Sequence, residues 1–408
     1  MPEKLFLQDY KTGKEYTYAN LIKDLNSLTE LNIYSREEDL YSVFLHLTAS
    51  ILCKQNLILL DSDFSDSELS ALEIDTEKLT SVRNIEPLGI RDQANLIERL
   101  MQPSDWQLTL FTSGTTGLPK KVVHTLTSLT RAVRISDRHT SDVWGFAYNP
   151  THIAGLQVFF QALLNGNSLI NLYGASRNLI FDLIKCYGIT NISATPTFYR
   201  MLLPSSETYP TVRKLTSGGE KFDPYLAEQL LQIFPEAKLR NVYASTEAGT
   251  ILEAKEDIFT ITDETLCKVE DGELYIHRIL LGESDDVTLD GDWYATGDLV
   301  EVISTNPTRF RFLHRKNEMI NVGGYKVNPY EVETALEKHP QVKQAYVYGK
   351  ANSLTGNILI ADVVAESNIQ EKELRTFLAS SLQPFKLPRV INFVDSIELT
   401  RSGKLKRT

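Results

Sequence analysis

Residues 112–120 read TSGTTGLPK and follow a short β-prone run, Gln107 to Phe111. Glycine, proline and small hydroxyl residues dominate 112–121, so we expect no regular structure there, whereas a helical pattern begins at Leu126. The backbone N–H groups and hydroxyls of such a loop can surround a polyphosphate, and its terminal lysine adds positive charge. Its two glycines are spaced differently from those of a Walker A loop. Taken alone, a loop of this composition is more often a plain turn. If it binds phosphate, the contacts come from Thr112, Ser113, Gly114, Thr115, Thr116, Gly117 and Lys120.

Strand and helix patterns alternate on both sides of this loop. Each strand-like run is short and apolar, and each helical run carries apolar residues at helical spacing. The strand-like runs are 56–60, 144–148, 168–172 and 189–194, and the helical runs are 41–52, 153–165 and 177–187. This alternation predicts an α/β fold with a largely parallel, helix-covered sheet.

The pattern changes twice further along the chain. Residues 251–312 contain short β-prone pieces separated by turns, including a strong hairpin signal at Asp290-Gly291, and predict a small, mostly antiparallel subdomain. From about residue 315 onward, the order of elements predicts a compact α+β domain. We therefore expect a large domain over 1–314 and a small C-terminal domain over 315–408.

The overall charge limits the class of ligand. The 408 residues include 42 Lys and Arg against 53 Asp and Glu, a formal net charge of −11. This argues against nucleic acid as a partner, because a general phosphate-backbone binder needs a basic face. A local basic site for one anionic ligand remains possible.

Cysteine usage and hydropathy bear on the compartment. The three cysteines lie far apart without metal-ligand spacing, which is typical of a reducing compartment. The N-terminus lacks the apolar region of a secretory signal, and no apolar run is long enough to cross a bilayer. We expect a cytoplasmic protein without membrane insertion.

Four further motifs follow the loop in order. They are NVYASTE at 241–247, YATGD at 294–298, HRKNEMI at 314–320 with GGYKV at 323–327, and LTRSGK at 399–404. Together with TSGTTGLPK, they resemble the motifs of the ANL superfamily of adenylate-forming enzymes, which contains acyl- and aryl-CoA ligases, peptide-synthetase adenylation domains and luciferases. Five motifs in the family's order, spread over 110–404, are very unlikely to arise by chance.

The resemblance implies a carboxylate that attacks the α-phosphorus of ATP with the help of Mg²⁺. Thr246 would bond the α-phosphate, Glu247 would hold Mg²⁺, and Lys404 would reach the forming acyl-phosphate linkage. Taken alone, Thr246 and Glu247 are also typical of a helix N-cap followed by a favourably placed acid. Lysines near a polar C-terminus are ordinarily solvated.

The resemblance also implies the contacts to the nucleoside. Tyr243 would stack on adenine, Asp298 would accept hydrogen bonds from the ribose hydroxyls, and Arg315 would support the ribose or a phosphate. Gly218 and Gly219 would allow the backbone to approach the ligand closely, although they also suit a plain turn.

The sequence gives weaker signals for the acyl pocket than for the nucleotide site. Residues 150–156, PTHIAGL, resemble the family's PxxHxxG segment, which implies that His152 borders the carboxylate. Without the resemblance, His152 is a residue at the start of a helix. We expect the side chains that select the acid to come from 150–160, 195–200 and 216–222.

The small domain is mobile in the ANL superfamily, so the resemblance implies that it rotates about a hinge. Asn317 would be the hinge residue here, at a position where the family often has Asp. The rotation would withdraw Lys404 and present a second loop that admits a pantetheine thiol. This thiolation loop consists of Gly323, Gly324, Tyr325 and Lys326. Three residues depart from glycine in the family's pattern: Lys121, Ala244 and His314.

The function that the resemblance implies is an ATP-dependent, AMP-forming acid–thiol ligase. The acceptor thiol would belong to CoA or to the phosphopantetheine of an acyl carrier protein. Only 109 residues precede Leu110, which favours an aromatic or other compact acid over a long-chain one.

Two alternatives remain open. A stand-alone adenylation domain that loads an amino acid would need an acidic residue near 150–156 for the α-amine, and that stretch has none. A non-catalytic nucleotide-binding homologue would have lost essential residues. Four of these are present: Lys120, Glu247, Asp298 and Lys404.

Overall fold

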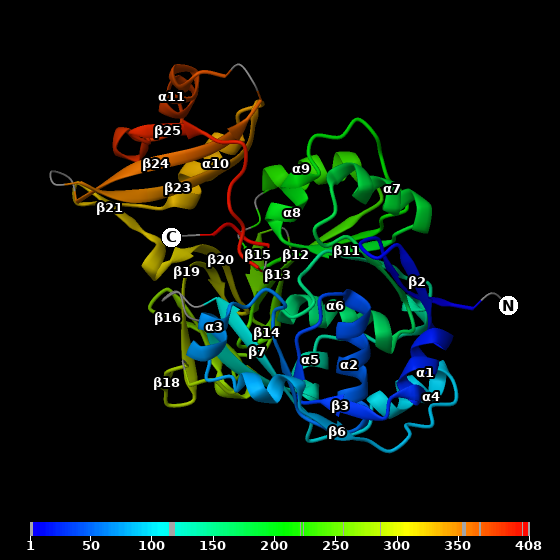
Figure 1. Ribbon diagram of the computed structural model, residues 1–408. Coiled ribbons are helices and arrows are strands. Elements are labelled where there is room, and N and C mark those ends of the chain that lie inside the picture. Colours follow the sequence, from blue (N-terminus) through cyan, green and yellow to red (C-terminus); the bar gives the residue numbers. More distant parts are fainter. Residues whose placement is uncertain are drawn as a thin grey trace.

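The computed structural model contains a large body and a smaller one beside it (Figure 1). It describes residues 3–113, 119–220, 222, 224–255, 257–285, 287–352, 356–366, 369–401 and 403–406. Strand β20 (Thr308–Arg315) belongs to a sheet of the large body and β21 (Ile320–Val322) to the sheet of the small one. We keep the domain boundary between 314 and 315 as a proposal.

The largest sheet has 14 strands within the described residues, and six of them form a parallel part. Its parallel strands are, in spatial order, β1 (Leu5–Asp9), β10 (Ser168–Asn171), β9 (Val143–Phe146), β11 (Asn191–Ala194), β12 (Lys214–Gly218) and β13 (Lys238–Ser245), with β2 (Lys14–Thr17) antiparallel to β1. Helices α6 (Ile153–Leu164), α7 (Arg177–Tyr187), α8 (Pro196–Met201) and α9 (Pro224–Ile233) lie in the connections between them. The predicted α/β fold class is confirmed, and the strand ends at Ala194, Gly218 and Ser245 meet at one edge, where α/β proteins place ligands.

The β-rich segment continues this same sheet. Strand β13 pairs antiparallel with β14 (Gly249–Lys255), after which the order is β15 (Ile258–Thr260), β20, β19 (Trp293–Thr305), β17 (Glu273–His277) and β16 (Cys267–Glu270). The predicted hairpin at Asp290-Gly291 is present, since β18 (Leu289–Asp290) pairs with β19. The strands of this segment pair antiparallel, and they continue the parallel sheet because β14 pairs with β13 along Asn241–Ser245.

A second sheet of the large body carries the phosphate loop. Its order is β4 (Tyr34–Ser35), β5 (Leu57–Leu59), β7 (Gln107–Ser113) and β8 (Pro119–Thr125). The expectation that all of 112–121 is irregular is wrong at both ends, because Thr112 pairs with Lys120 and Ser113 with Pro119 in the ladder of this hairpin. Antiparallel hydrogen bonds satisfy the backbone there better than an open loop would.

The remaining elements of the large body surround these sheets. Buried Phe44 of α2 stacks on Phe159 of α6 with ring centroids 4.1 Å apart, so the two helices share one core. The other elements are α1 (Tyr18–Ser27), β3 (Glu30–Asn32), α2 (Leu40–Leu52), α3 (Asp66–Ala71), β6 (Val82–Asn84), α4 (Gln93–Leu100) and α5 (Leu126–Thr130), with 3-10 turns at Thr76–Thr80, Asp137–His139 and Arg278–Leu280.

The small body is an α+β unit with its own core. Its sheet has the order β22 (Tyr325–Val327), β21, β24 (Gly356–Ala365) and β23 (Val342–Asn352), and β25 (Val390–Phe393) pairs parallel with β24. Helices α10 (Pro329–Glu337) and α11 (Glu371–Ala379) belong to it, as do 3-10 turns at Lys316–Glu318 and Pro384–Lys386. After β25 the tail runs back to the large body, as the red segment of Figure 1 shows.

Candidate active site

A buried carboxylate joins three strands of the large sheet. Asp298 of β19 accepts a hydrogen bond from the Tyr243 hydroxyl of β13 at 2.6 Å and one from Arg315 Nε at 2.8 Å. Asp298 and Arg315 are direct partners in the β19–β20 ladder, which sets their approach. Burial and the neighbouring carboxylate raise the pKa of Tyr243, so its hydroxyl stays protonated and donates. The Tyr243 ring stacks on the Phe312 ring, and the two ring centroids lie 4.7 Å apart.

The turn that carries Thr246 and Glu247 is fastened through its backbone. His124 of β8 contacts the Thr246 carbonyl through Nε2 at 2.8 Å, and the Gly282 N–H donates to the Glu247 carbonyl at 2.6 Å. Arg131 donates to the carbonyl of Ala248, the next residue. Burial lowers the pKa of His124, so we infer a neutral ring with Nε2–H as the donor. The Glu247 side chain therefore projects from a turn with a fixed backbone.

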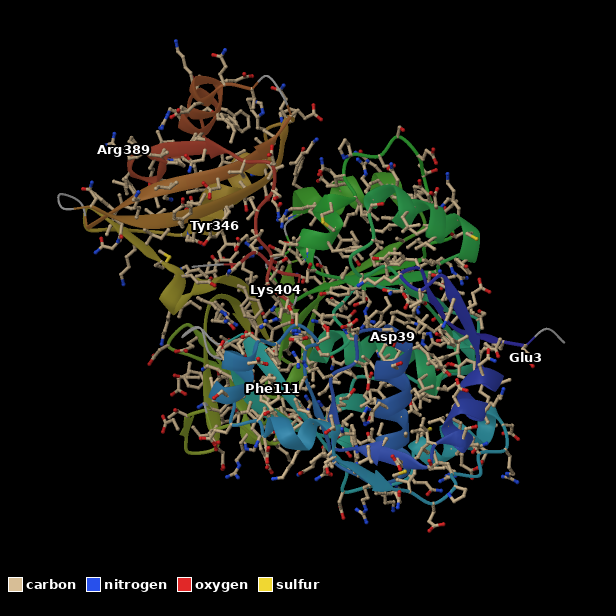
Figure 2. All side chains as sticks on the ribbon, in the orientation of Figure 1. Glu3, Asp39, Phe111, Tyr346, Arg389 and Lys404 are labelled. Atoms are coloured by element: carbon tan, nitrogen blue, oxygen red, sulfur yellow. The ribbon has the colours of Figure 1, made fainter. Side chains whose placement is uncertain are left out.

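Lys404 reaches the same region from the C-terminal tail (Figure 2). The Thr195 hydroxyl donates to the Gly403 carbonyl at 3.1 Å, and the Leu405 N–H donates to Glu220 Oε1 at 3.2 Å. Gly219 has a φ of +84°, and a Cβ added there would lie 2.9 Å from Lys404 Cε. Only glycine suits both the backbone angle and the space that this lysine occupies.

The electrostatic surroundings of Lys404 link it to the carboxylate cluster. Burial lowers the pKa of its ammonium group, and Arg315 acts in the same direction. Glu220, Glu247 and Asp298 oppose that shift through their charges. The predicted residues of three distant motifs therefore lie within electrostatic reach of one ammonium group.

His152 lies beside an acid that the sequence pattern did not reveal. The buried Asp61 carboxylate accepts a hydrogen bond from Asn149 Nδ2 at 2.8 Å and one from the Thr151 hydroxyl. His152 Nε2 is 3.6 Å from Asp61 Oδ2, and that nitrogen is buried without a hydrogen-bond partner. Burial raises the pKa of Asp61, but the contacts from His152, Thr151 and Asn149 outweigh it, so the net pKa is lowered. The acidic, polar sequence of 61–70 predicts a solvated loop that enters a helix, and this prediction is wrong for Asp61, which is buried.

Two models of protein families match this chain. The model described as AMP-binding enzyme covers residues 43–269, and the model described as AMP-binding enzyme C-terminal domain covers 331–404. The chain belongs to the AMP-binding enzyme family. The resemblance to the adenylate-forming enzymes is thereby confirmed.

Relatives show how far the similarity extends. The human mitochondrial acyl-coenzyme A synthetase ACSM4 is 26% identical over 73% of this chain and 59% of its own length. A fatty acid–[acyl-carrier-protein] ligase, ScoC, from Streptomyces coeruleorubidus is 29% identical over 73% of this chain and 65% of its own length. The chain therefore aligns with about three fifths of the length of these relatives.

The fold matches solved structures of the family. The crystal structure of ATP-bound MatB from Rhodopseudomonas palustris superimposes with a TM-score of 0.74, at 20% identity, covering 99% of this chain and 94% of that one. This similarity supports the arrangement of a large N-terminal and a small C-terminal unit. None of the helices in the described ranges is long and apolar enough to cross a membrane.

The phosphate loop of this AMP-binding enzyme is described only at its ends. Thr112 and Ser113 lie in β7 and Lys120 lies in β8. Gly114, Thr115, Thr116 and Gly117 fall outside the described residues.

The other predicted glycine pairs have clear local roles. A Cβ at Gly218 would lie 2.8 Å from Val242 Cγ2 on the neighbouring strand, so glycine allows β12 and β13 to approach at the edge of the site. Gly323 and Gly324 turn the β21–β22 hairpin with φ of 59° and 90°. In that hairpin, Tyr325 stacks on Phe385 of the small body at 4.5 Å and Lys326 is exposed. Asn317 lies in the 3-10 turn between the bodies.

Sequence reasoning missed His124, Arg131 and Asp61. His124 and Asp61 contact motif residues and Arg131 contacts the residue that follows a motif, each from a distant segment, so the motif spacing carried no sign of them. A polar residue such as His124 within the β-prone run VVHT was the available signal.

We expect the His124 contact to hold the backbone of the Thr246–Glu247 turn in the position that binds Mg·ATP. His124→Leu removes the donor to the buried Thr246 carbonyl, which should lower the kcat/KM for Mg·ATP by about 10-fold. The control is His124→Gln, whose side-chain amide retains an N–H donor and should keep more of the activity. Equal loss in both variants, or a loss confined to the kinetics of the acid, would contradict this role.

Proposed function

We propose that this protein is an ATP-dependent, AMP-forming acid–thiol ligase. The observation that carries the proposal is the position of Lys404, which lies against Gly219 and within electrostatic reach of Arg315, Glu247 and Asp298. A carboxylate and the α-phosphate of ATP repel each other, so their reaction needs a cation where the new bond forms. A half-buried lysine brought to the nucleotide motifs by a separate segment supplies that cation.

The first half-reaction follows from these positions. A carboxylate oxygen of the acid attacks the α-phosphorus, the bond to the β-phosphate oxygen breaks, and pyrophosphate leaves. Lys404 neutralises charge at the acyl-phosphate linkage, and Asp298 accepts hydrogen bonds from the ribose hydroxyls. Arg315 supports the ribose or a phosphate, and Tyr243 stacks on adenine. The Glu247 carboxylate is the type of oxygen ligand that Mg²⁺ prefers, and its turn is held by backbone contacts. Bound there, Mg²⁺ would screen the charge of the phosphates.

The second half-reaction requires Lys404 to leave. The sulfur of a pantetheine thiol attacks the acyl carbonyl carbon, the thiol loses its proton, and AMP departs with the oxygen that linked it to the acyl group. Rotation about Asn317 would exchange Lys404 for the Gly323–Lys326 hairpin, whose paired positive-φ glycines form a compact turn. CoA and a carrier-protein phosphopantetheine both present this thiol.

A second candidate, the activation of an amino acid, is favoured by Asp61. The expected acid near 150–156 is absent from the sequence, but Asp61 brings a buried carboxylate to 3.6 Å from His152. An ammonium group of a substrate could pair with it, although Asn149 and Thr151 already donate to one of its oxygens. Asp61→Asn would abolish amino-acid activation through such a pair and would spare the activation of acids without an amine.

The test is a screen for acid-dependent pyrophosphate release. The panel contains compact aromatic and aliphatic acids, long-chain acids and amino acids, each with CoA or a carrier protein as separate acceptors. Compact acids come first because Phe198 and Tyr199, in a segment expected to line the acyl channel, are bulky and buried. The proposal predicts pyrophosphate release with at least one acid and thioester formation with one acceptor. Release of phosphate in place of pyrophosphate would contradict it.

A further inference from the structure

An acidic site at the start of α3 contacts the tail that carries Lys404. Arg401 Nε lies 2.8 Å from Asp63 Oδ1, and its two terminal nitrogens lie 2.8 and 3.1 Å from the two oxygens of Glu68. The guanidinium carbon also lies 4.8 Å from the centroid of the Phe64 ring. We call Asp63, Phe64 and Glu68 the Arg401 site. Fork-like pairing with a carboxylate and stacking on an aromatic ring are specific to arginine.

Glu68 is held in place for this contact. The Ser65 N–H donates to Glu68 Oε2 at 2.9 Å and the Glu68 N–H donates to Ser65 Oγ at 3.3 Å, which forms a capping box at the N-terminus of α3. The hydrogen bonds from Arg401 lower the pKa of Glu68 to about 2. The carboxylate is therefore ionised and oriented throughout the neutral range.

Further contacts join the large body to the described residues of this tail near Lys404. The Tyr173 hydroxyl donates to the Arg401 carbonyl at 3.3 Å, and Thr195 and Glu220 contact the backbone of Gly403 and Leu405 at 3.1 and 3.2 Å. These are single hydrogen bonds between neutral groups or to one carboxylate oxygen. The Arg401 contact is the multidentate ionic one, and Arg401 precedes Lys404 by a single turn of chain.

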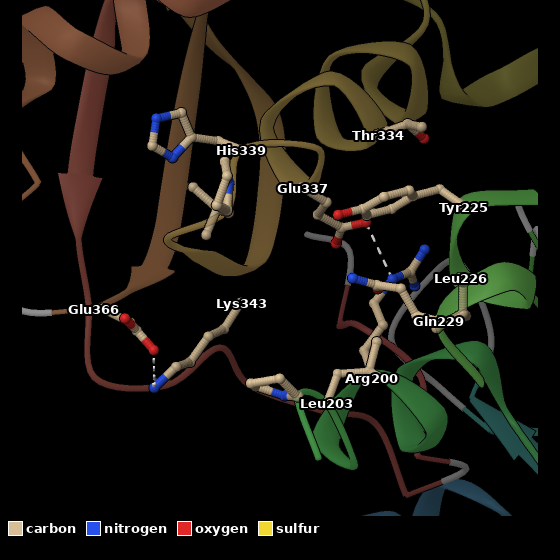
Figure 3. Close-up of a pocket in the computed structure, with 13 residues that line it drawn as sticks. Arg200, Leu203, Tyr225, Leu226, Gln229, Thr334, Glu337, His339, Lys343 and Glu366 are labelled. Carbon is tan, nitrogen blue, oxygen red and sulfur yellow. Dashed lines mark ion pairs between the residues drawn. The ribbon is translucent and has the colours of Figure 1, made fainter. Parts of the chain in front are cut away.

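A second ion pair joins the two bodies away from the tail. Arg200 of α8 lies 3.0 Å from Glu337 of α10, and Figure 3 shows the two side chains facing each other across the crevice between the bodies. This pair contacts the small body through α10 and does not involve the segment that carries Lys404. The two contacts can therefore be altered separately.

We propose that the Arg401 site holds Lys404 in the adenylation position, which makes Arg401 a positioning residue for the first half-reaction. The inference rests on the proposed function, because it assigns Lys404 to adenylation. Withdrawal of Lys404 before the thiol attack must break the Arg401 contact. Losing that contact should then slow adenylation and leave the second half-reaction unaffected or faster.

The experiment uses the full chain and an acid identified by the screen. Arg401→Gln should lower acid-dependent pyrophosphate–ATP exchange by about 5- to 20-fold while thioester formation from supplied acyl adenylate stays within about 2-fold of wild type. The matched control is Lys406→Gln, which removes the same charge from a lysine that pairs within the tail, 3.1 Å from Glu398. It should leave both half-reactions unchanged.

A charge exchange separates this role from a general loss of structure. Arg401→Glu alone should be slower in adenylation than Arg401→Gln, and adding Glu68→Arg should recover at least about 3-fold of the rate. Equal slowing of both half-reactions, or no recovery in the double variant, would overturn the proposal.

Hydrogen exchange tests the contact without catalysis. In the ligand-free protein, amides of residues 399–405 should exchange at least about 5-fold faster in Arg401→Gln, return toward wild type in the double variant, and stay unchanged in Lys406→Gln. If wild type activates no acid but the tail responds in this way, the proposed function fails and the Arg401 site stands. Unchanged exchange in Arg401→Gln overturns the site itself.

Discussion

Replacing Lys404 with alanine is expected to lower acid-dependent pyrophosphate–ATP exchange by at least about 100-fold. The lysine is brought to the nucleotide motifs by the tail, and Gly219 leaves the space that its side chain fills. Without it, the charge that offsets the repulsion between the incoming carboxylate and the α-phosphate is lost. Lys406→Ala serves as the control because Lys406 is exposed and pairs with Glu398.

The same variant also tests whether Lys404 and the Gly323–Lys326 hairpin exchange positions between the two half-reactions. In the proposed mechanism, Lys404 takes no part in the attack of the thiol on the acyl adenylate, so Lys404→Ala should form thioester from supplied acyl adenylate at close to the wild-type rate. A wild-type rate of pyrophosphate exchange would remove Lys404 from adenylation. Loss of both half-reactions would instead contradict the alternation of the small domain.

Replacing Asp298 with alanine is expected to raise the KM for ATP by at least about 10-fold and to lower the stability of the fold. Asp298 is buried, pairs with Arg315 and accepts a hydrogen bond from Tyr243. Its loss would remove the proposed ribose acceptor and leave two polar groups without their partner. The control is Tyr243→Phe, which keeps the ring stacked on Phe312 and the carboxylate in place. Nucleotide titrations and thermal unfolding measure the two effects.

The two readouts separate binding from structure. If Asp298→Ala unfolds at a lower temperature but binds ATP as wild type does, Asp298 is a structural residue and the ribose assignment is wrong. If Tyr243→Phe weakens ATP binding as much as Asp298→Ala, the phenol hydroxyl and not the carboxylate makes the decisive contact.

Much of the fold could be predicted because its signals are local. Helix α7 begins and ends as expected, at Arg177 and Tyr187, since its apolar residues recur at helical spacing and Gly188 follows in the left-handed conformation. The parallel strands were legible as short apolar runs. The way in which the segment 251–312 joins the parallel sheet could not be predicted, because the pairing of β13 with β14 depends on contacts that no single segment encodes.

The candidate site shows the same division. Tyr243, Asp298, Arg315 and Lys404 could be named in advance because each belongs to a motif. Their partners could not. Asp61, Asp63 and Glu68 all belong to an acidic stretch that is ordinarily solvated, and only the fold brings this stretch to His152 and to Arg401. In the same way, the sequence of 150–156 contains no acid, whereas the fold places Asp61 beside His152.

The central claim is that the acid is activated as an acyl adenylate, and isotope transfer tests it most directly. The acid is supplied with ¹⁸O in both carboxylate oxygens, together with ATP, Mg²⁺ and the thiol acceptor. Mass spectrometry then measures the ¹⁸O content of the AMP, the phosphate products and the thioester. Attack of the carboxylate on the α-phosphorus predicts that the AMP released carries one ¹⁸O atom. Label in inorganic phosphate with formation of ADP, or AMP without label beside a labelled thioester, would contradict the account.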